Sequence, residues 1–166
     1  RLGLPIDKFV VGSNRNDILT RFFASGSMEK GEVHPTISPS MDIQVSSNFE
    51  RLLFELEGRN GGRVASIMDG LSDSGRFTVD AGTLKAAQAL FEGASFDDEE
   101  TKAAIKAVFD ATGELVAPHT AVGIAAATLG PAHHGEPAQP HPTQPAAHLA
   151  RGKLHVCLGP AAGPMI

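Results

Sequence analysis

The sequence of 166 residues lacks several residue types, and each absence narrows what the protein can be. Tryptophan and tyrosine are missing, which leaves phenylalanine as the only large aromatic side chain. A single cysteine, Cys157, excludes an internal disulfide and favours a reducing compartment. No apolar run approaches the roughly 18 residues that a membrane span requires, and no secretory leader opens the sequence. We therefore expect a cytoplasmic protein that makes no contact with a membrane.

Positive charge is not in excess either. The formal net charge is −5, from 14 basic and 19 acidic residues. Because nucleic-acid binding needs a basic face, we expect no nucleic acid among the partners. Apolar residues make up 42% of the chain and charged residues 20%, which is ordinary for a globular domain. The length allows one domain with a core of useful size.

Residues 8–26 predict a strand, a polar loop and a helix. The run KFVVG at 8–12 is typical of a short buried strand. Apolar residues then recur at helical spacing, and Gly26 is a plausible helix stop. These apolar residues are Ile18, Leu19, Phe22 and Phe23.

The polar loop between this strand and helix holds Asn14, Asn16 and Asp17. In an α/β sheet such a loop lies at the carboxyl end of a strand, where ligands bind. The amino terminus of the following helix also attracts anions. One interpretation is therefore a ligand-binding loop. The alternative is that the Asn and Asp side chains only cap the helix, which is a common arrangement.

The stretch SPSMDIQVSSNFERLLFEL, residues 38–56, leads from a proline-bearing connection into a second helix. Ser47 and Glu50 have the spacing of a capping box. One apolar stripe follows, formed by Phe49, Leu52, Leu53 and Leu56. Capping and packing leave Asn48 and Arg51 unassigned. An arginine at a helix start, next to amide donors, can bind phosphate or carboxylate; the alternative is a solvated arginine.

Further helices are predicted after Gly58. Apolar spacing indicates helices at 63–72 and 80–92, and Ser95 is predicted to cap another that Gly113 ends. Acidic residues at 97–100 suit the first turn of that helix. Residues 114–116 predict a short strand, and Pro118 predicts the start of a helix through 127.

The motif PHTAVG places His119 and Thr120 in the first turn of this last helix. His119 can serve there as a general base or as a hydrogen-bond partner. The alternative is a buried histidine whose ring is satisfied by the backbone.

Residues 128–166 differ from the rest in composition. They hold most of the histidines and prolines, no phenylalanine, and one acidic residue, Glu136. No helical or strand period is sustained, so disorder is predicted. The histidine spacing, with prolines between, matches no zinc motif, and we predict no metal site. Cys157 has no partner pattern of a nucleophile.

Three segments occur together in one order: FVVGSNRNDILTRFFASGSM, PTISPSMDIQVSSNFERLLFEL and PHTAVGIAAA. This combination resembles the carboxyl-terminal part of threonine synthases, over residues 1–127. The resemblance implies an α/β fold of the pyridoxal-phosphate (PLP) dependent, tryptophan-synthase-β-like type, mostly helical in this part, with 58–113 as a helical insertion. It also implies conversion of O-phospho-L-homoserine and water to L-threonine and phosphate, with PLP as the electron sink.

The resemblance also implies where ligands would lie. It places Asn14, Asn16, Asp17, Asn48 and Arg51 near the substrate, and His119 and Thr120 near the cofactor. The family's Schiff-base lysine and its glycine-rich phosphate loop would precede residue 1. We therefore expect no catalytic residue in this chain and no activity from it alone. No lysine of the chain matches the cofactor lysine: Lys8, Lys30, Lys85, Lys102, Lys106 and Lys153.

Two departures from the family pattern have consequences. Ala117 stands where the family usually has an acid before PHTA, and the resemblance ends at Ala127. We expect a reading-frame error as the origin of 128–166. A chain without its sheet neighbours would leave apolar faces underburied, including Phe22, Phe23, Leu53 and Phe54. The alternative function is a non-catalytic helical interaction module or a truncated gene product.

Overall fold

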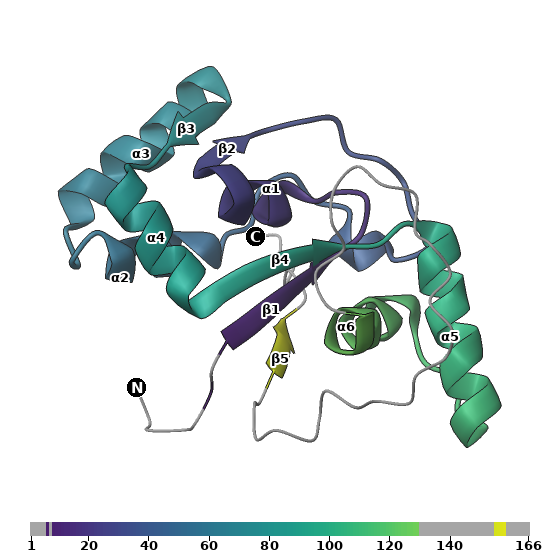
Figure 1. Cartoon of the computed structure of the whole chain (residues 1–166). Coiled ribbons are helices and arrows are strands. Elements are labelled where there is room, and N and C mark those ends of the chain that lie inside the picture. Colours follow the sequence, from purple (N-terminus) through teal and green to yellow (C-terminus); the bar gives the residue numbers. More distant parts are fainter. Residues whose placement is uncertain (1–5, 7, 130–154, 159–166) are drawn as a thin grey trace.

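A three-stranded parallel sheet forms the centre of the chain (Figure 1). Its order is β4-β1-β5, with β1 at Lys8–Ser13, β4 at Phe91–Ser95 and β5 at His155–Leu158. Phe9 of β1 lies opposite Phe91 on one side and opposite Val156 on the other. The computed structural model describes residue 6, residues 8–129 and residues 155–158.

Strand β4 corrects the sequence interpretation at two points. Residues 91 and 92 were predicted as the end of a helix, yet they begin β4, which joins the central sheet beside β1. Helix α5, Asp98–Thr112, begins with a capping box between Asp97 and Glu100 rather than at Ser95. The physical reason is that β4 forms by pairing with a strand far away in the sequence, which local spacing does not reveal.

Helix α1, Ile18–Ser25, follows β1 as predicted and ends at Gly26, whose φ is 76°. It packs against β4, where Gly93 gives it room. A Cβ atom on Gly93 would lie 2.4 Å from the Thr20 Cα atom. A glycine is therefore required for this close approach of helix and strand.

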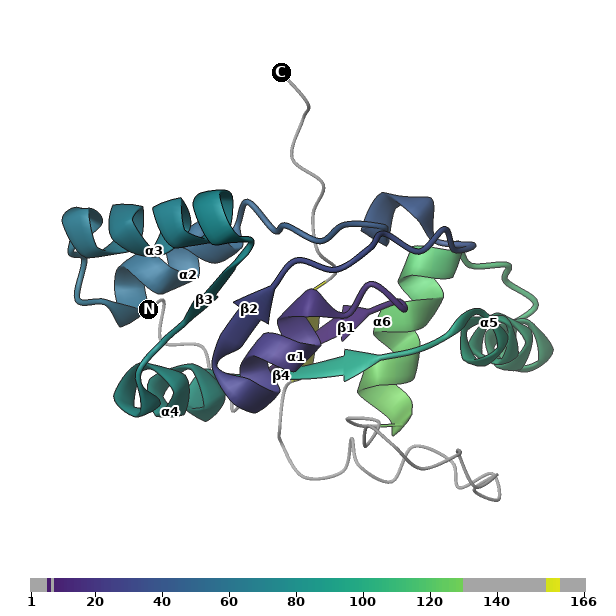
Figure 2. The same ribbon diagram turned by 90° about the horizontal axis from the view of Figure 1, so that it is seen from above.

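Three helices pack together on one side of α1: α2 at Phe49–Leu56, α3 at Gly61–Ser74 and α4 at Ala81–Leu90 (Figures 1 and 2). A two-stranded antiparallel sheet joins this group to α1. Its strands are β2, Ser27–Glu29, and β3, Arg76–Thr78.

The start of α2 differs from the prediction. Asn48 is its N-cap residue, and no side-chain hydrogen bond caps the helix, so the expected Ser47–Glu50 capping box is wrong. Asn60 and Asp80 do cap α3 and α4 through their side chains. Packing of the apolar face, rather than capping, therefore holds the first turn of α2.

The core between α1, α2 and the small sheet is aromatic. The Phe22 and Phe49 rings meet edge to face with centroids 4.6 Å apart, and Phe77 packs against both. Phe22 and Leu53 are fully buried and Phe23 is 4% exposed, which corrects the expectation of underburied faces. Phe54 alone of that set stays open, with 38% exposed. The helices α2, α3 and α4 thus supply the cover that the sequence analysis expected to be missing.

Helix α6, Pro118–Leu129, begins at Pro118 as predicted and packs on β1 and α5 (Figure 1). Residues 114–116 form no strand, contrary to the prediction. A second buried cluster lies between sheet and α6 and includes Val10, Met41, Phe96 and Val122. Met41 belongs to the short 3₁₀ helix η1, Pro39–Met41, so this cluster anchors the connection after β2.

The predicted disorder and absence of metal in 128–166 lie largely outside the described residues. Within that segment, Thr128 and Leu129 complete α6 and His155–Leu158 forms β5, which was not predicted. Among the described residues, no helix has the length and apolar character needed to cross a membrane.

Candidate functional site

The carboxyl end of β1 continues into a buried polar cluster. Asn14 is 1% exposed and Asn16 is 2% exposed. The Asn14 side-chain nitrogen donates to Asp42 Oδ1 and to Thr36 Oγ1, both at 2.7 Å. Its oxygen accepts from the Asn16 backbone N–H at 2.9 Å. Asn14 and Asn16, predicted as ligand-binding residues, thus lie together, but the Asn14 side chain bonds to the segment that follows β2.

The Asn16 side chain also uses its hydrogen-bonding groups within the protein. The Asn16 side-chain nitrogen donates to the His34 carbonyl oxygen at 2.8 Å and to Asp42 Oδ1 at 3.0 Å. Its oxygen accepts from the His34 backbone N–H at 2.8 Å. With donors and acceptor all engaged, both amides fit a structural role better than direct contact with a ligand. We call the group that converges here the Asp42 network: Asn14, Asn16, Thr36, Ser38 and Asp42.

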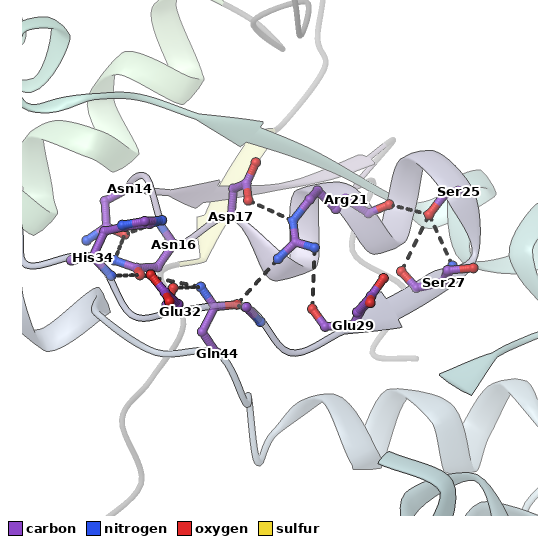
Figure 3. A network of polar contacts seen from close by, with 11 residues as sticks. Asn14, Asn16, Asp17, Arg21, Ser25, Ser27, Glu29, Glu32, His34 and Gln44 are labelled. Carbon is purple, nitrogen blue, oxygen red and sulfur yellow. Dashed lines mark hydrogen bonds and ion pairs between the residues drawn. The ribbon is translucent and has the colours of Figure 1, made fainter. Parts of the chain in front are cut away.

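Gln44 and Arg21 extend these contacts along α1 (Figure 3). The Gln44 amide donates to the Glu32 carbonyl oxygen at 3.0 Å and accepts from the Arg21 guanidinium at 3.3 Å. Arg21 also pairs with Asp17 at 2.9 Å. Asp17 is the N-cap residue of α1 by position, yet its side chain makes no capping bond. The capping interpretation is therefore wrong for this loop.

His119 and Thr120 lie in the first turn of α6 and are both exposed. The interpretation of His119 as a buried, backbone-satisfied histidine is therefore wrong. The start of α6 lies beside η1 in Figure 2, and Met41 of η1 shares a buried cluster with Val122 of α6. His119 and Thr120 consequently occupy the same edge as the Asp42 network, at the carboxyl ends of β1 and β4.

Asn48 and Arg51 are exposed on the first turn of α2. Helix α2 packs with α3 and α4, on the other side of the molecule from α5 and α6 (Figures 1 and 2). The structure therefore separates the predicted substrate residues into two groups. Asn14, Asn16 and Asp17 follow β1, whereas Asn48 and Arg51 belong to α2, which packs with α3 and α4.

The sequence interpretation missed Thr36, Ser38, Asp42 and Gln44. It described the segment before the second helix only as a proline-bearing connection. The available signal was the density of small polar residues in TISPSMDIQ, which a purely solvated loop does not need. Among the described residues, no group of three histidines, cysteines or carboxylates converges as a metal site would require.

Sequence comparison identifies similar proteins, although no family model matches the chain. It is 45% identical over 144 residues to a threonine synthase of Pseudomonas aeruginosa, covering 80% of this chain and 31% of that protein. This chain matches one part of a threonine synthase. The threonine synthase of Saccharomyces cerevisiae is 37% identical over 140 residues, with 76% of this chain and 27% of the relative covered.

Solved threonine synthases share the fold. A PLP-bound threonine synthase from Brucella melitensis superposes with a TM-score of 0.77 and 37% identity, covering 98% of this chain and 31% of that one. The yeast threonine synthase gives a TM-score of 0.70 at 37% identity, over 75% of this chain and 27% of that chain. The expected resemblance to one part of a threonine synthase and the expected α/β fold are thereby confirmed. The chain spans less than a third of the length of these threonine synthases.

Proposed function

We propose that this chain is the carboxyl-terminal part of a PLP-dependent threonine synthase, which converts O-phospho-L-homoserine and water to L-threonine and phosphate. The observation that carries the proposal is the 45% identity to a curated threonine synthase over most of this chain. The likeness to a PLP-bound structure supports the cofactor. PLP, when bound, supplies the electron sink for the elimination and addition steps.

The described lysines do not fit the Schiff-base role, which needs a desolvated amine. Lys8 is half-buried, and its amine lies 3.5 Å from the Glu92 carboxylate. The other described lysines are exposed: Lys30, Lys85, Lys102 and Lys106. We therefore assign the lysine and the phosphate-binding loop to a part of the enzyme outside this sequence, and derive no step through PLP from these residues.

Within that enzyme, we assign residues 1–127 to the PLP-binding domain and leave 128–166 without a role. We propose that His119 and Thr120, which are exposed at the start of α6, contact the cofactor. We further propose that Asn48 and Arg51 contact the phosphorylated substrate, because a guanidinium beside amide donors suits phosphate. We also propose that the loop after β1 holds the substrate side of the site, through Asn14, Asn16 and Asp17. A cytoplasmic location suits the single cysteine.

A chimeric enzyme tests this function. In the Pseudomonas aeruginosa threonine synthase, the matching segment is replaced by residues 8–127 of this chain. We expect phosphate release from O-phospho-L-homoserine and growth of a threonine auxotroph. The same enzyme with the segment deleted is the negative control. A chimera that is soluble and binds PLP, yet releases no phosphate, contradicts the proposal.

A further inference from the structure

Asp42 receives hydrogen bonds from every other side chain of its network except Ser38. Its Oδ1 accepts from the side chains of Asn14 at 2.7 Å, Asn16 at 3.0 Å and Thr36 at 2.7 Å. Its Oδ2 accepts from the Thr36 backbone N–H at 2.9 Å. A carboxylate has about four lone-pair sites, so Asp42 uses its capacity on neutral donors. No cation among the residues that the structure describes pairs with it.

This carboxylate helps to fix how the two asparagine amides are turned, together with the His34 carbonyl at Asn16. Both side-chain nitrogens face Asp42, which leaves the Asn14 oxygen for the Asn16 N–H and the Asn16 oxygen for the His34 N–H. Turning either amide around would set its oxygen against the carboxylate. Asp42 therefore selects one orientation of each amide, and the two oxygens then hold the backbone at residues 16 and 34.

Asp42 directly follows the buried residue Met41. Met41 is 2% exposed and packs in the cluster that holds α6 against the sheet. Ile37, on the other side of η1, donates its backbone N–H to the Asp98 carboxylate at the start of α5, at 3.3 Å. Residues 34–44 thus touch the β1 end, α5 and α6, and Asp42 joins them to the β1 end.

We infer that Asp42 is a positioning residue of the substrate edge. It acts through Asn14 and Asn16, whose amides lock residues 34–44 across the carboxyl end of β1 and next to the first turn of α6. This inference rests on the proposed function only for the identity of the ligand at that edge. The lock itself is a property of this chain.

Hydrogen exchange on the 166-residue chain tests the lock. Asp42→Asn replaces one acceptor oxygen by an NH2 group, which then faces either the Asn14 and Asn16 nitrogens or the Thr36 backbone N–H, so at least one contact is lost. We expect the His34 and Thr36 amide protons to exchange about tenfold faster, while those of β1 and α1 keep their rates. Asp110→Asn, an exposed aspartate of α5, is the matched control. Unchanged exchange at His34 and Thr36 overturns the inference.

Kinetics of the chimera test the positioning. We expect Asp42→Asn to lower kcat/KM by about tenfold to a hundredfold per folded enzyme, and Asp110→Asn to leave it unchanged. A loss that only follows the folded fraction, with kcat and KM intact, overturns the positioning role. An inactive parent chimera instead contradicts the proposed function and leaves the exchange result standing.

A second pair of variants covers the case in which Asp42→Asn does not fold. Thr36→Val keeps the shape of the side chain but removes a donor to Asp42. Thr36→Ser retains that hydroxyl. We expect Thr36→Val to raise KM and to accelerate exchange at His34, and Thr36→Ser to restore both. Equal behaviour of the two variants contradicts a role for these hydrogen bonds.

Discussion

Among the described residues, buried polar side-chain atoms almost all have a hydrogen-bond partner. The exception among the described residues is the Thr20 hydroxyl, which has no partner although Thr20 is 3% exposed. It points at the notch left by Gly93, where a strand passes close to the helix. A buried hydroxyl without a partner lowers the free energy of unfolding, because its desolvation is not offset by a hydrogen bond.

Thr20→Val tests this cost. Valine keeps the shape and branching of threonine but removes the unpaired hydroxyl, so we expect the free energy of unfolding to stay level or to rise by up to about 1 kcal/mol. Thr101→Val is the matched control, since the Thr101 hydroxyl donates to the Asp97 carbonyl oxygen at 2.7 Å. Its loss should lower stability by about 1 kcal/mol. Equal urea midpoints for the two variants argue against the account.

Arg51 is the residue whose function is simplest to test. Arg51→Ala in the chimera should raise KM for O-phospho-L-homoserine about tenfold, because a charge-assisted bond to phosphate is lost. We expect kcat to change less. Arg76→Ala, an exposed arginine of β3, is the control and should leave both constants unchanged. Identical KM values for the two variants remove Arg51 from the substrate site.

At the scale of elements, α1 and β4 approach each other closely at Gly93. Gly93→Ala puts a methyl group 2.4 Å from the Thr20 Cα atom, which forces the helix or strand to move. We expect a loss of about 1–3 kcal/mol in unfolding free energy. Gly70→Ala in α3, with the nearest atom at 3.6 Å, is the control and should gain about 0.5–1 kcal/mol. A tolerated Gly93→Ala would contradict this packing.

The start of α4 predicts a pH dependence. The Thr83 backbone N–H, the Thr83 hydroxyl and the Gly82 N–H, with nearby Arg63, hold the pKa of Asp80 below its usual value of 3.8. A carboxyl with a lowered folded pKa adds stability above its unfolded pKa and loses it as pH falls through the folded one. The midpoint difference between wild type and Asp80→Ala should thus be constant from neutral pH to about pH 5 and shrink below about pH 4.

The control for this pH series is Asp69→Ala, which removes an exposed aspartate of α3 with no capping role. It accounts for the loss of one negative charge. A wild-type advantage over Asp80→Ala that stays the same down to pH 2 would show that the cap does not depend on the ionised carboxylate.

At the scale of the whole molecule, the described chain combines a folded core with an incomplete site. Two buried clusters lie on the two faces of the parallel sheet, one under α1 and one under α6. The polar edge at the strand ends is well ordered by its own hydrogen bonds. No described lysine is buried beside it. The described residues thus provide an ordered polar edge, and the proposed covalent link to PLP requires a lysine from another part of the enzyme.

This arrangement predicts the behaviour of the isolated chain. With PLP and O-phospho-L-homoserine added, we expect the 166-residue chain to release no phosphate, because its described lysines are solvated or ion-paired. The active chimera, assayed at the same concentration, is the positive control. Phosphate release by the chain itself would show that one of its lysines does serve the cofactor.

The sequence by itself determined the elements whose signals are local. The apolar spacing of α1 and the glycine stops at Gly26 and Gly113, both with φ of 76°, were predictable because they involve residues within one or two turns. Pro118 likewise marked the start of α6. The family resemblance depended on an ordered set of such segments and was confirmed by the comparisons.

Only the tertiary structure decided what depends on distant partners. Strand β4 exists because Phe91 pairs beside Phe9, and the Thr36–Asp42 region is ordered because Asn14 and Asn16 reach it from β1. It also placed Asn48 and Arg51 at the start of a helix that packs with α3 and α4. Strand pairing and buried hydrogen bonds join residues far apart in the sequence, so their energy enters only once the chain has folded, and no local pattern records it.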